Sequence, residues 1–438
     1  MIFQATKSFA RSRPGAGAPA AIRMGLSLAL ALVALAGQPG CSSTKTRPMV
    51  SAEELQKRSV ADNIETREVF AGVVGRLITR VSDRQTAGES APQQMDILAM
   101  SGGGDFGAFG SGFLLGWGKA PTMPRPDFDA VTGVSTGALL APFAYIGDDA
   151  SIELVDSLYR NPKKDWIGGG GLLSFLPSSP SFMTIPGLQR DIRTSVGEQL
   201  ITKMAAESRK GKVLIISATD LDLGRQKFWD VGAESEKAIA NNDMDRVQRI
   251  LFASSAIPAV FPPIEIDGGL YADGGVTANV FLRLDPRSPH AFITRWKAEH
   301  PGKPLPKVRY WVIINNQLNQ TPATVQAKWP EILGPALATA IRSATIAEVR
   351  WLSSQVDYVN ASMGTDIEVR VVSIPDDWRA PVKGDFKKET MESLSELGRK
   401  LGADPASWQL WASPARQSTA APAQLPALQA STGTAAPQ

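Results

Sequence analysis

The motif most typical of a catalytic residue in the sequence is G-x-S-x-G, in which Ser135 lies two residues after Gly133 and two before Gly137. A serine on a sharp strand-to-helix turn exposes its hydroxyl, and small neighbours let the backbone double back there. An apolar run precedes this motif and a helical pattern over 138–145 follows it, as the turn requires. Ser135 is therefore a candidate nucleophile, and the alternative is a buried tight turn without chemistry.

A carboxylate in a later glycine-rich loop is the candidate base. Asp273 is followed by Gly274 and Gly275. The same letters occur six residues earlier at Asp267, where the flanking short apolar segments predict a hairpin turn. We interpret Asp267 as structural and Asp273 as functional.

The usual base for a serine is histidine, and the chain has two, His290 and His300. Both stand in polar stretches beside a proline, which predict exposed loops. A carboxylate can replace imidazole if burial raises its proton affinity and the oxyanion is well stabilised. Asp273 is the stronger candidate on these grounds.

A third loop, Ser101 to Gly107, directly follows an apolar run and precedes a helical one. Its three consecutive glycines let a ligand approach the backbone closely, and amides at a helix start favour negative charge. The loop is predicted to cradle an anion such as an oxyanion. Its letters also match G-x-G-x-x-G, with Asp127 about twenty residues further on, so dinucleotide binding is an alternative. A glycine-rich turn without a ligand is another.

The elements that must position these loops alternate between short apolar runs and helical patterns. The predicted strands are 96–100, 128–131, 213–217, 310–314 and 367–372, and the predicted helices include 138–145, 191–208 and a long one after Pro335. Most of the strands are apolar on both faces, which is typical of a parallel sheet. The alternation predicts an α/β fold, in which reactive groups gather at the carboxyl ends of the strands.

Residues 1–40 predict a secretory signal peptide, because cationic residues precede an apolar run too short to span a bilayer. The following Cys41 and its neighbours resemble a bacterial lipoprotein signal. This implies export, acylation of Cys41 and a cell-envelope location, at the outer membrane or the periplasmic face. The alternative is an ordinary signal peptide with an incidental cysteine.

The remaining chain divides into three predicted parts. Residues 41–92 read as a tether and a helix that opens at the capping box Ser51 to Glu54. Residues 93–412 form the predicted globular domain. The segment 413–438, rich in Ala, Pro, Ser, Thr and Gln, is predicted to be disordered because it cannot bury enough apolar surface.

Composition excludes several function classes. The 438 residues include 46 Lys plus Arg and 43 Asp plus Glu, with a net charge of +3, and the first 40 residues hold basic but no acidic side chains. A basic nucleic-acid surface is therefore not indicated. One cysteine excludes an internal disulfide, and with two histidines it disfavours most metal sites. We expect no metal or organic cofactor.

Together the three loops resemble the patatin-like phospholipase family. The resemblance covers roughly Met95 to Val280, and its motifs are the glycine loop, the Ser135 elbow, Ala218-Thr-Asp-Leu221 with Gly224 to Trp229, Ser255-Ala-Ile-Pro258, and Asp273-Gly-Gly275. It implies a three-layer α/β fold with a mainly parallel central sheet flanked by helices.

The resemblance also implies an activity, that of a lipid acyl hydrolase with a Ser-Asp dyad. Ser135 would be the nucleophile, Asp273 its base, and the amides of Gly102, Gly103 and Gly104 the oxyanion hole. Phospholipids or other acyl esters would be the substrates. Phe106 stands where the family usually has an arginine, which leaves the choice between phospholipid and neutral ester open. A silent envelope scaffold on this fold is the alternative.

Overall fold

The computed structural model describes residues 47–86, 93–169, 181, 183–281, 291–319 and 322–411. The chain divides into two units, Met1–Val50 and Ser51–Gln438, and the described helices and strands belong to the second. The predicted signal segment, Cys41, His290 and the predicted tail from Ser413 lie outside the described residues.

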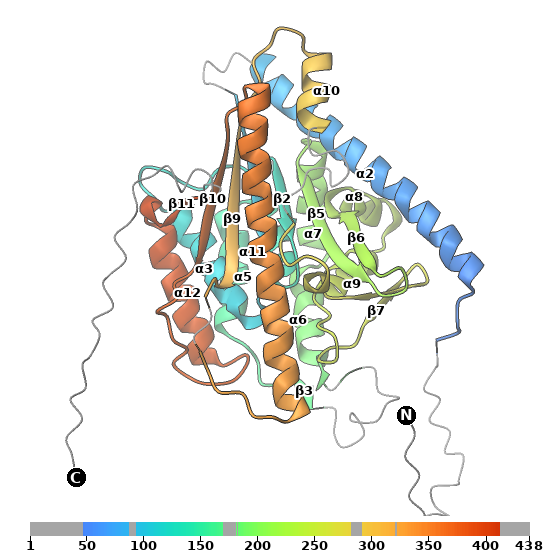
Figure 1. The fold of residues 1–438 in the computed structure, drawn as a ribbon, viewed down its shortest axis with the longest axis vertical. Coiled ribbons are helices and arrows are strands. Elements are labelled where there is room, and N and C mark those ends of the chain that lie inside the picture. Colours follow the sequence, from blue (N-terminus) through green and yellow to red (C-terminus); the bar gives the residue numbers. More distant parts are fainter. Residues whose placement is uncertain are drawn as a thin grey trace, which may run out of the picture. The chain divides into compact units, whose positions relative to one another are not determined.

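A nine-stranded sheet forms the centre of the second unit, in the order β11-β10-β9-β1-β2-β5-β8-β7, with β6 also paired to β5 (Figure 1). Its middle is parallel, from β10 through β9, β1 and β2 to β5, and antiparallel strands complete both sides. The parallel strands are β1 (Gln94–Met100), β2 (Ala130–Gly133), β5 (Val213–Asp220), β9 (Lys307–Gln317) and β10 (Ile367–Ile374). The others are β6 (Arg225–Asp230), β7 (Ile264–Ile266), β8 (Gly269–Ala272) and β11 (Gln409–Leu410), while β3 (Gly168–Gly169) and β4 (Met183–Thr184) pair separately.

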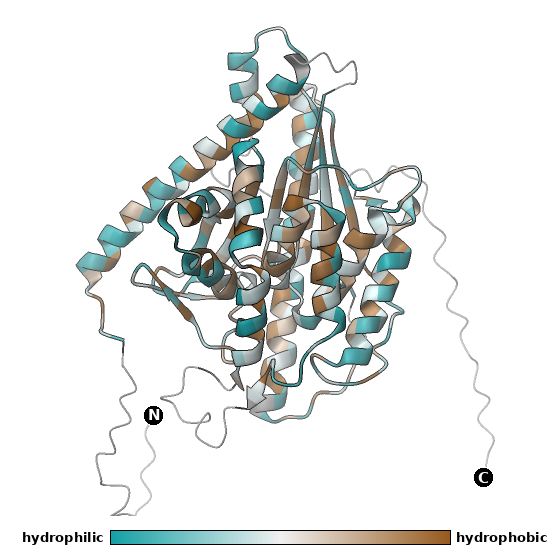
Figure 2. Ribbon diagram, turned by 180° about the vertical axis from the view of Figure 1, so that it is seen from behind, coloured by the Kyte–Doolittle hydropathy of each residue, from teal (hydrophilic) through white to brown (hydrophobic). Residues whose placement is uncertain are grey.

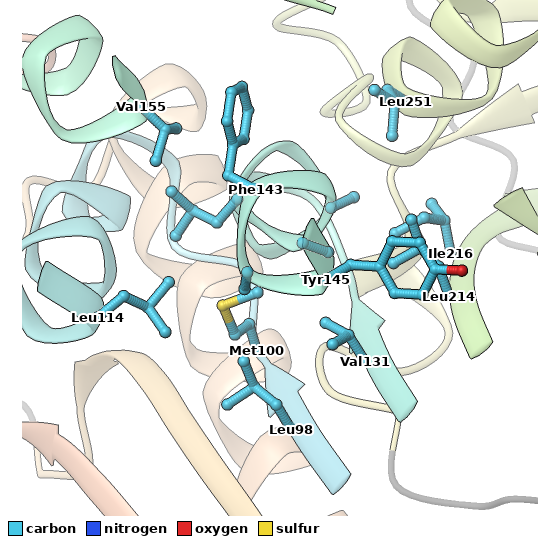
Figure 3. Packing of buried hydrophobic residues seen from close by; sticks show 14 of the residues in the cluster. Leu98, Met100, Leu114, Val131, Phe143, Tyr145, Val155, Leu214, Ile216 and Leu251 are labelled. Atoms are coloured by element: carbon cyan, nitrogen blue, oxygen red, sulfur yellow. The ribbon is translucent and has the colours of Figure 1, made fainter. Parts of the chain in front are cut away.

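Alternate side chains of the buried strands point to opposite faces of the sheet, and each face has its own helical layer. Leu98, Met100 and Val131 belong to one core, with α4 over them (Figure 3). The helices packed into this core are α3 (Gly107–Trp117), α4 (Thr136–Ile146), α5 (Asp149–Arg160), α6 (Pro186–Ser195), α7 (Glu198–Arg209), α8 (Val231–Asn241), α9 (Asp245–Ser254) and α12 (Lys388–Gly402). Polar and apolar bands alternate along these helices, as expected where one side is buried (Figure 2).

The opposite face, which includes Ile97 and Ile215, is covered by α2 (Ala52–Thr86), α10 (Ala291–Glu299) and α11 (Trp329–Met363). α2 begins where the capping box predicts, and Glu54 N donates to Ser51 Oγ at 3.2 Å. The predicted α/β fold with a mainly parallel sheet between helical layers is confirmed. All five predicted strands are present, although β2 begins two residues later than predicted.

Two predicted helices differ from the observed ones. The single helix predicted over 191–208 is two helices, α6 and α7, because Val196 leaves helical geometry (φ −98°, ψ 52°) and Gly197 is extended (φ −86°, ψ −172°). The long helix predicted after Pro335 begins earlier, at Trp329, with Pro330 in its first turn, where a missing N–H costs nothing. Pro335 is thus inside α11 rather than before it.

Candidate active site

The turn between β2 and α4 carries Ser135 in a conformation that side chains rarely adopt, with φ 54° and ψ −124°. Its two glycines are required by close backbone contacts. A Cβ on Gly133 would lie 2.4 Å from the carbonyl oxygen of Gly137, and one on Gly137 would lie 2.3 Å from that of Met100. The structure therefore has the strand-turn-helix geometry predicted from G-x-S-x-G.

Hydroxyl groups at the end of α9 hold this strained turn. Ser135 N donates to Ser254 Oγ (3.0 Å), and Ser254 Oγ donates in turn to the carbonyl of Ser217 on β5 (2.7 Å). Ser255 Oγ donates to the carbonyl of Ser135 (3.1 Å). Sequence reasoning missed both roles, although the serines immediately precede the Ala-Ile-Pro motif.

Asp273 leaves the end of β8 and is buried, with 4% of its surface exposed. Its Oδ1 accepts a hydrogen bond from Gly275 N at 2.7 Å, and its own N–H donates to Ala256 O at 2.8 Å. Thr219 Oγ1 donates to the Asp273 carbonyl at 2.9 Å. These bonds fix the carboxyl group against the serine turn.

The carboxyl group of Asp273 and the hydroxyl of Ser135 are brought together. Burial raises the pKa of Asp273 to about 6, while the Ser135 hydroxyl and the Gly275 N–H oppose this rise. The second carboxylate oxygen, Oδ2, has no partner with good hydrogen-bond geometry among the described residues. It is therefore free to receive a proton, and catalytic hydrogen bonds are often loose before substrate binds.

The glycine loop lies beside the serine, but its three amides are not equivalent. Gly102 N donates to the carbonyl of Asn279 at 3.0 Å, so this amide holds the loop in place. The N–H groups of Gly103 and Gly104 form no hydrogen bond within the described residues, and Gly104 lines the same pocket as Ser135. Of the three amides predicted for the oxyanion hole, that of Gly102 is therefore already used, and those of Gly103 and Gly104 remain as candidates.

Two buried asparagines, one on β9 and one bonded to α11, hold the glycine loop. Asn315 Nδ2 donates to Ser101 O (2.8 Å), and Asn315 N donates to Ser101 Oγ (2.9 Å). Asn279 Nδ2 donates to Thr345 Oγ1 on α11 (2.9 Å). Sequence reasoning missed both, although Asn315 directly follows the predicted strand 310–314, at the carboxyl end where functional polar groups gather.

Residues 98–284 match the model of the family described as patatin-like phospholipase. The chain carries a patatin-like phospholipase domain. All three predicted loops fall within the match, whose family supports lipid acyl hydrolysis as the general class of activity. A search of curated proteins finds no significant match.

Two solved structures show distant similarity to the chain. The crystal structure of VipD from Legionella pneumophila is 14% identical over 74% of this chain and 69% of its own, with a TM-score of 0.34. That of the type III effector protein ExoU is 15% identical over 72% of this chain and 53% of its own, with a TM-score of 0.32.

An apolar pocket opens beside Ser135 in the patatin-like domain. Its walls come from successive turns of α4 and from α5, α6 and α9, and include Leu139, Phe143, Val155, Leu188, Ile192 and Phe252. Trp166 also lines it.

The remaining candidates from the sequence do not line this pocket. Asp127 precedes β2, at the opposite edge of the sheet from the glycine loop, and pairs with Arg80 at 3.0 Å. This position argues against the dinucleotide alternative, which needs the acidic residue near the loop. His300 packs on Trp296 at the end of α10 and is half-buried instead of exposed. Phe106 packs edge-on against Trp378, with ring centroids 5.6 Å apart.

Proposed function

We propose that this protein hydrolyses fatty-acyl esters of membrane lipids with a dyad of Ser135 and Asp273. One observation carries the proposal: the strained serine lies against a buried carboxyl group at the wall of an apolar pocket. The family match supports the general class, a lipid acyl hydrolase.

The reaction follows from the positions of these groups. Asp273 Oδ2 takes the proton of Ser135 Oγ as this oxygen attacks the ester carbonyl, and the amides of Gly103 and Gly104 stabilise the oxyanion. Asp273 then returns the proton to the leaving alcohol, which departs from the acyl-enzyme. Asp273 next deprotonates a water molecule that attacks the acyl group, and it then gives that proton to Ser135 Oγ as the acyl–oxygen bond breaks, which releases the fatty acid and restores the enzyme.

The shape of the pocket supports an acyl chain as the group that is bound. Thr136, Leu139 and Phe143 line it from successive turns of α4, which corresponds to about 10 Å of helix. Phe106 adds an apolar ring on Trp378 where the family usually places a cation. Recognition is therefore proposed to rest on the acyl chain more than on an anionic head group.

The proposal is tested by fatty-acid release from vesicles of phosphatidylethanolamine and phosphatidylglycerol, measured by mass spectrometry. Ser135→Ala and Asp273→Asn should each reduce release at least about a thousandfold. Ser195→Ala is the matched control, because this hydroxyl lines the same pocket but bonds Asp191 O at 2.8 Å. It should retain activity.

Two outcomes would contradict the proposal. Undiminished release by folded Ser135→Ala would exclude this serine as the nucleophile. A folded wild type that is inactive on all acyl esters would favour the silent scaffold.

We also propose that the protein is exported and anchored to the cell envelope by acylated Cys41. The support is the sequence pattern around this cysteine, the only one in the chain. Metabolic labelling with a fatty acid should label wild type and not Cys41→Ser. Equal labelling of both would overturn the anchor.

A further inference from the structure

The amino-terminal part of α11, Glu331–Ser343, presents an apolar surface to solvent, and we call this segment the α11 tip. Ile332 and Leu333 are 47% and 46% exposed, which is unusual for such large apolar side chains on one helical turn. The tip holds two charged residues of opposite sign: Glu331 is exposed, whereas Arg342 is half-buried and donates to Gln317 O at 3.2 Å. The tip therefore lacks the polar outer face of an ordinary surface helix.

The remainder of α11 buries one face against the sheet. Val349, Leu352 and Val356 are buried against the sheet, in the core shared with β10. Among the described residues, α11 is the helix that is long and apolar enough to cross a membrane by length and composition. The free tip, however, measures about 20 Å, which is shorter than the roughly 30 Å of a hydrocarbon core. It can enter the surface of a bilayer but cannot span it.

The α11 tip lies at the same edge of the sheet as Ser135. β9 runs parallel to β1, and Ile313 pairs with Met100 just before the glycine loop. The chain leaves β9 at this carboxyl edge and returns along α11, which extends past the end of β9 (Figure 1). Thr345, two residues after the tip, accepts the hydrogen bond from Asn279, whose carbonyl holds Gly102.

Further large apolar side chains are exposed at this edge. Val276, three residues after Asp273, is 44% exposed. Val382 is 38% exposed in the segment after β10, and Phe386 of the same segment lines the pocket. Val325, before α11, is 45% exposed. Several loops at the catalytic edge thus expose large apolar side chains.

The amino-terminal connection leaves the second unit from this edge as well. Arg58 in the second turn of α2 binds Asp220 (2.8 Å) and Asp222 (2.9 Å), directly after the carboxyl end of β5. The eleven Cα-to-Cα steps from Cys41 to Ala52 span at most about 40 Å when fully extended. An acylated Cys41 would therefore keep this edge within about 40 Å of a bilayer.

We propose that the α11 tip docks on the surface of a lipid bilayer and turns the catalytic edge toward it. The inference rests on the proposed function in one respect: the bilayer is then also the source of the substrate. Ile332 and Leu333 enter the boundary between head groups and acyl chains, as apolar residues of interfacial helices do. Because the exposed tip has little charge, its binding depends weakly on ionic strength.

Vesicle flotation tests the docking directly. The full chain carries Cys41→Ser to prevent acylation and Ser135→Ala to prevent hydrolysis, and the vesicles contain phosphatidylethanolamine and phosphatidylglycerol. In this background Ile332→Asp with Leu333→Asp should weaken binding about tenfold or more, because two buried apolar side chains are lost. Binding of the parent chain should change little between low and high salt.

The matched control is Leu154→Asp with Tyr358→Asp, at positions 44% and 61% exposed and away from the tip. Tyr358 belongs to the other end of the same helix. This control should bind vesicles as the parent does, and thermal unfolding should show that both double variants are folded.

Activity on a soluble short-chain ester, measured with Ser135 present, separates this inference from the proposed function. Ile332→Asp with Leu333→Asp should keep that activity while losing vesicle binding. Unchanged vesicle binding by this variant would overturn the docking surface and leave the hydrolase intact. The parent chain could instead fail to bind vesicles and be oligomeric, and the same substitutions could make it monomeric. This result would show that a second copy of the chain covers the tip, and it would also overturn the inference.

Discussion

Gly102 lies so close to Ser135 that a Cβ atom built on the glycine would be 2.8 Å from the Cβ of the serine. The same added atom would lie 2.3 Å from Oδ1 of Asn279. The glycine loop and the turn that carries Ser135 therefore pack directly against each other at Gly102. A change of one methyl group at Gly102 must move the serine, the asparagine or the loop.

Substitutions in the glycine loop should therefore have unequal effects. Gly102→Ala should reduce kcat about a hundredfold or more, because it displaces Ser135 and the oxyanion donors. Gly104→Ala should do less, since nothing lies within 4 Å of its added Cβ and the cost is that of a positive φ, 61°. Steady-state kinetics on a soluble ester would measure both. Equal losses would show that local packing does not set the sensitivity of the loop.

The rate should follow the ionisation of Asp273. Burial raises the pKa of this carboxyl group to about 6, and only the ionised form can accept the serine proton. We expect kcat/KM to rise with pH, with a midpoint near 6 and a plateau above it. A profile that is flat from pH 4 to 8 would contradict the assignment of Asp273 as the base.

Asp105 provides the control for that measurement. Burial also raises its pKa to about 6, and its Oδ2 accepts a hydrogen bond from Phe386 N at 2.9 Å. Asp105→Asn keeps an acceptor there and should leave the midpoint of the pH profile unchanged. A midpoint that moves in this variant would assign the ionisation to Asp105 instead.

Asp273 should also make the folded protein less stable at neutral pH. Its pKa rises from 3.8 in the unfolded chain to about 6 in the folded one, so folding favours the protonated form. The stability that protonation contributes is complete below about pH 4 and is lost as the pH rises through 6. Asp273→Asn stays neutral at every pH. At pH 8 its free energy of unfolding should exceed that of wild type by up to about 3 kcal/mol, and it should unfold at a higher temperature. Denaturation at pH 4 and pH 8 would test this, and a variant that is less stable at pH 8 would contradict it.

Asn279 should act as a positioning residue for the oxyanion loop. Its side chain donates to Thr345 Oγ1, while its main-chain carbonyl holds Gly102 N. Asn279→Ala should lower kcat about tenfold with little change in KM, since it loosens the loop without touching the pocket. Thr345→Val removes the partner of the same hydrogen bond, so the two losses should not add in the double variant. Additive losses would show that the two residues act separately.

The parts of this site that depend on residues close together in the chain could be predicted from the sequence. The turn at Ser135 and the hairpin at Asp267 require glycines at fixed positions in the sequence, so a short motif is enough to predict each of them. The five apolar strands are similarly local, because their residue types fit a sheet buried on both faces. The prediction that Asp273 is the partner of the serine came from the order of these loops, through their resemblance to a known family.

Features that depend on contacts between segments far apart in the chain could be found only in the folded structure. The Gly102 amide is used by Asn279, 177 residues away, so the loop has two free donors instead of three. Ser254 supports the turn of Ser135 across 119 residues. The raised pKa of Asp273, the apolar pocket and the uncovered α11 tip are also products of packing. Burial is a property of all the surrounding segments together, and no local pattern of residues specifies it.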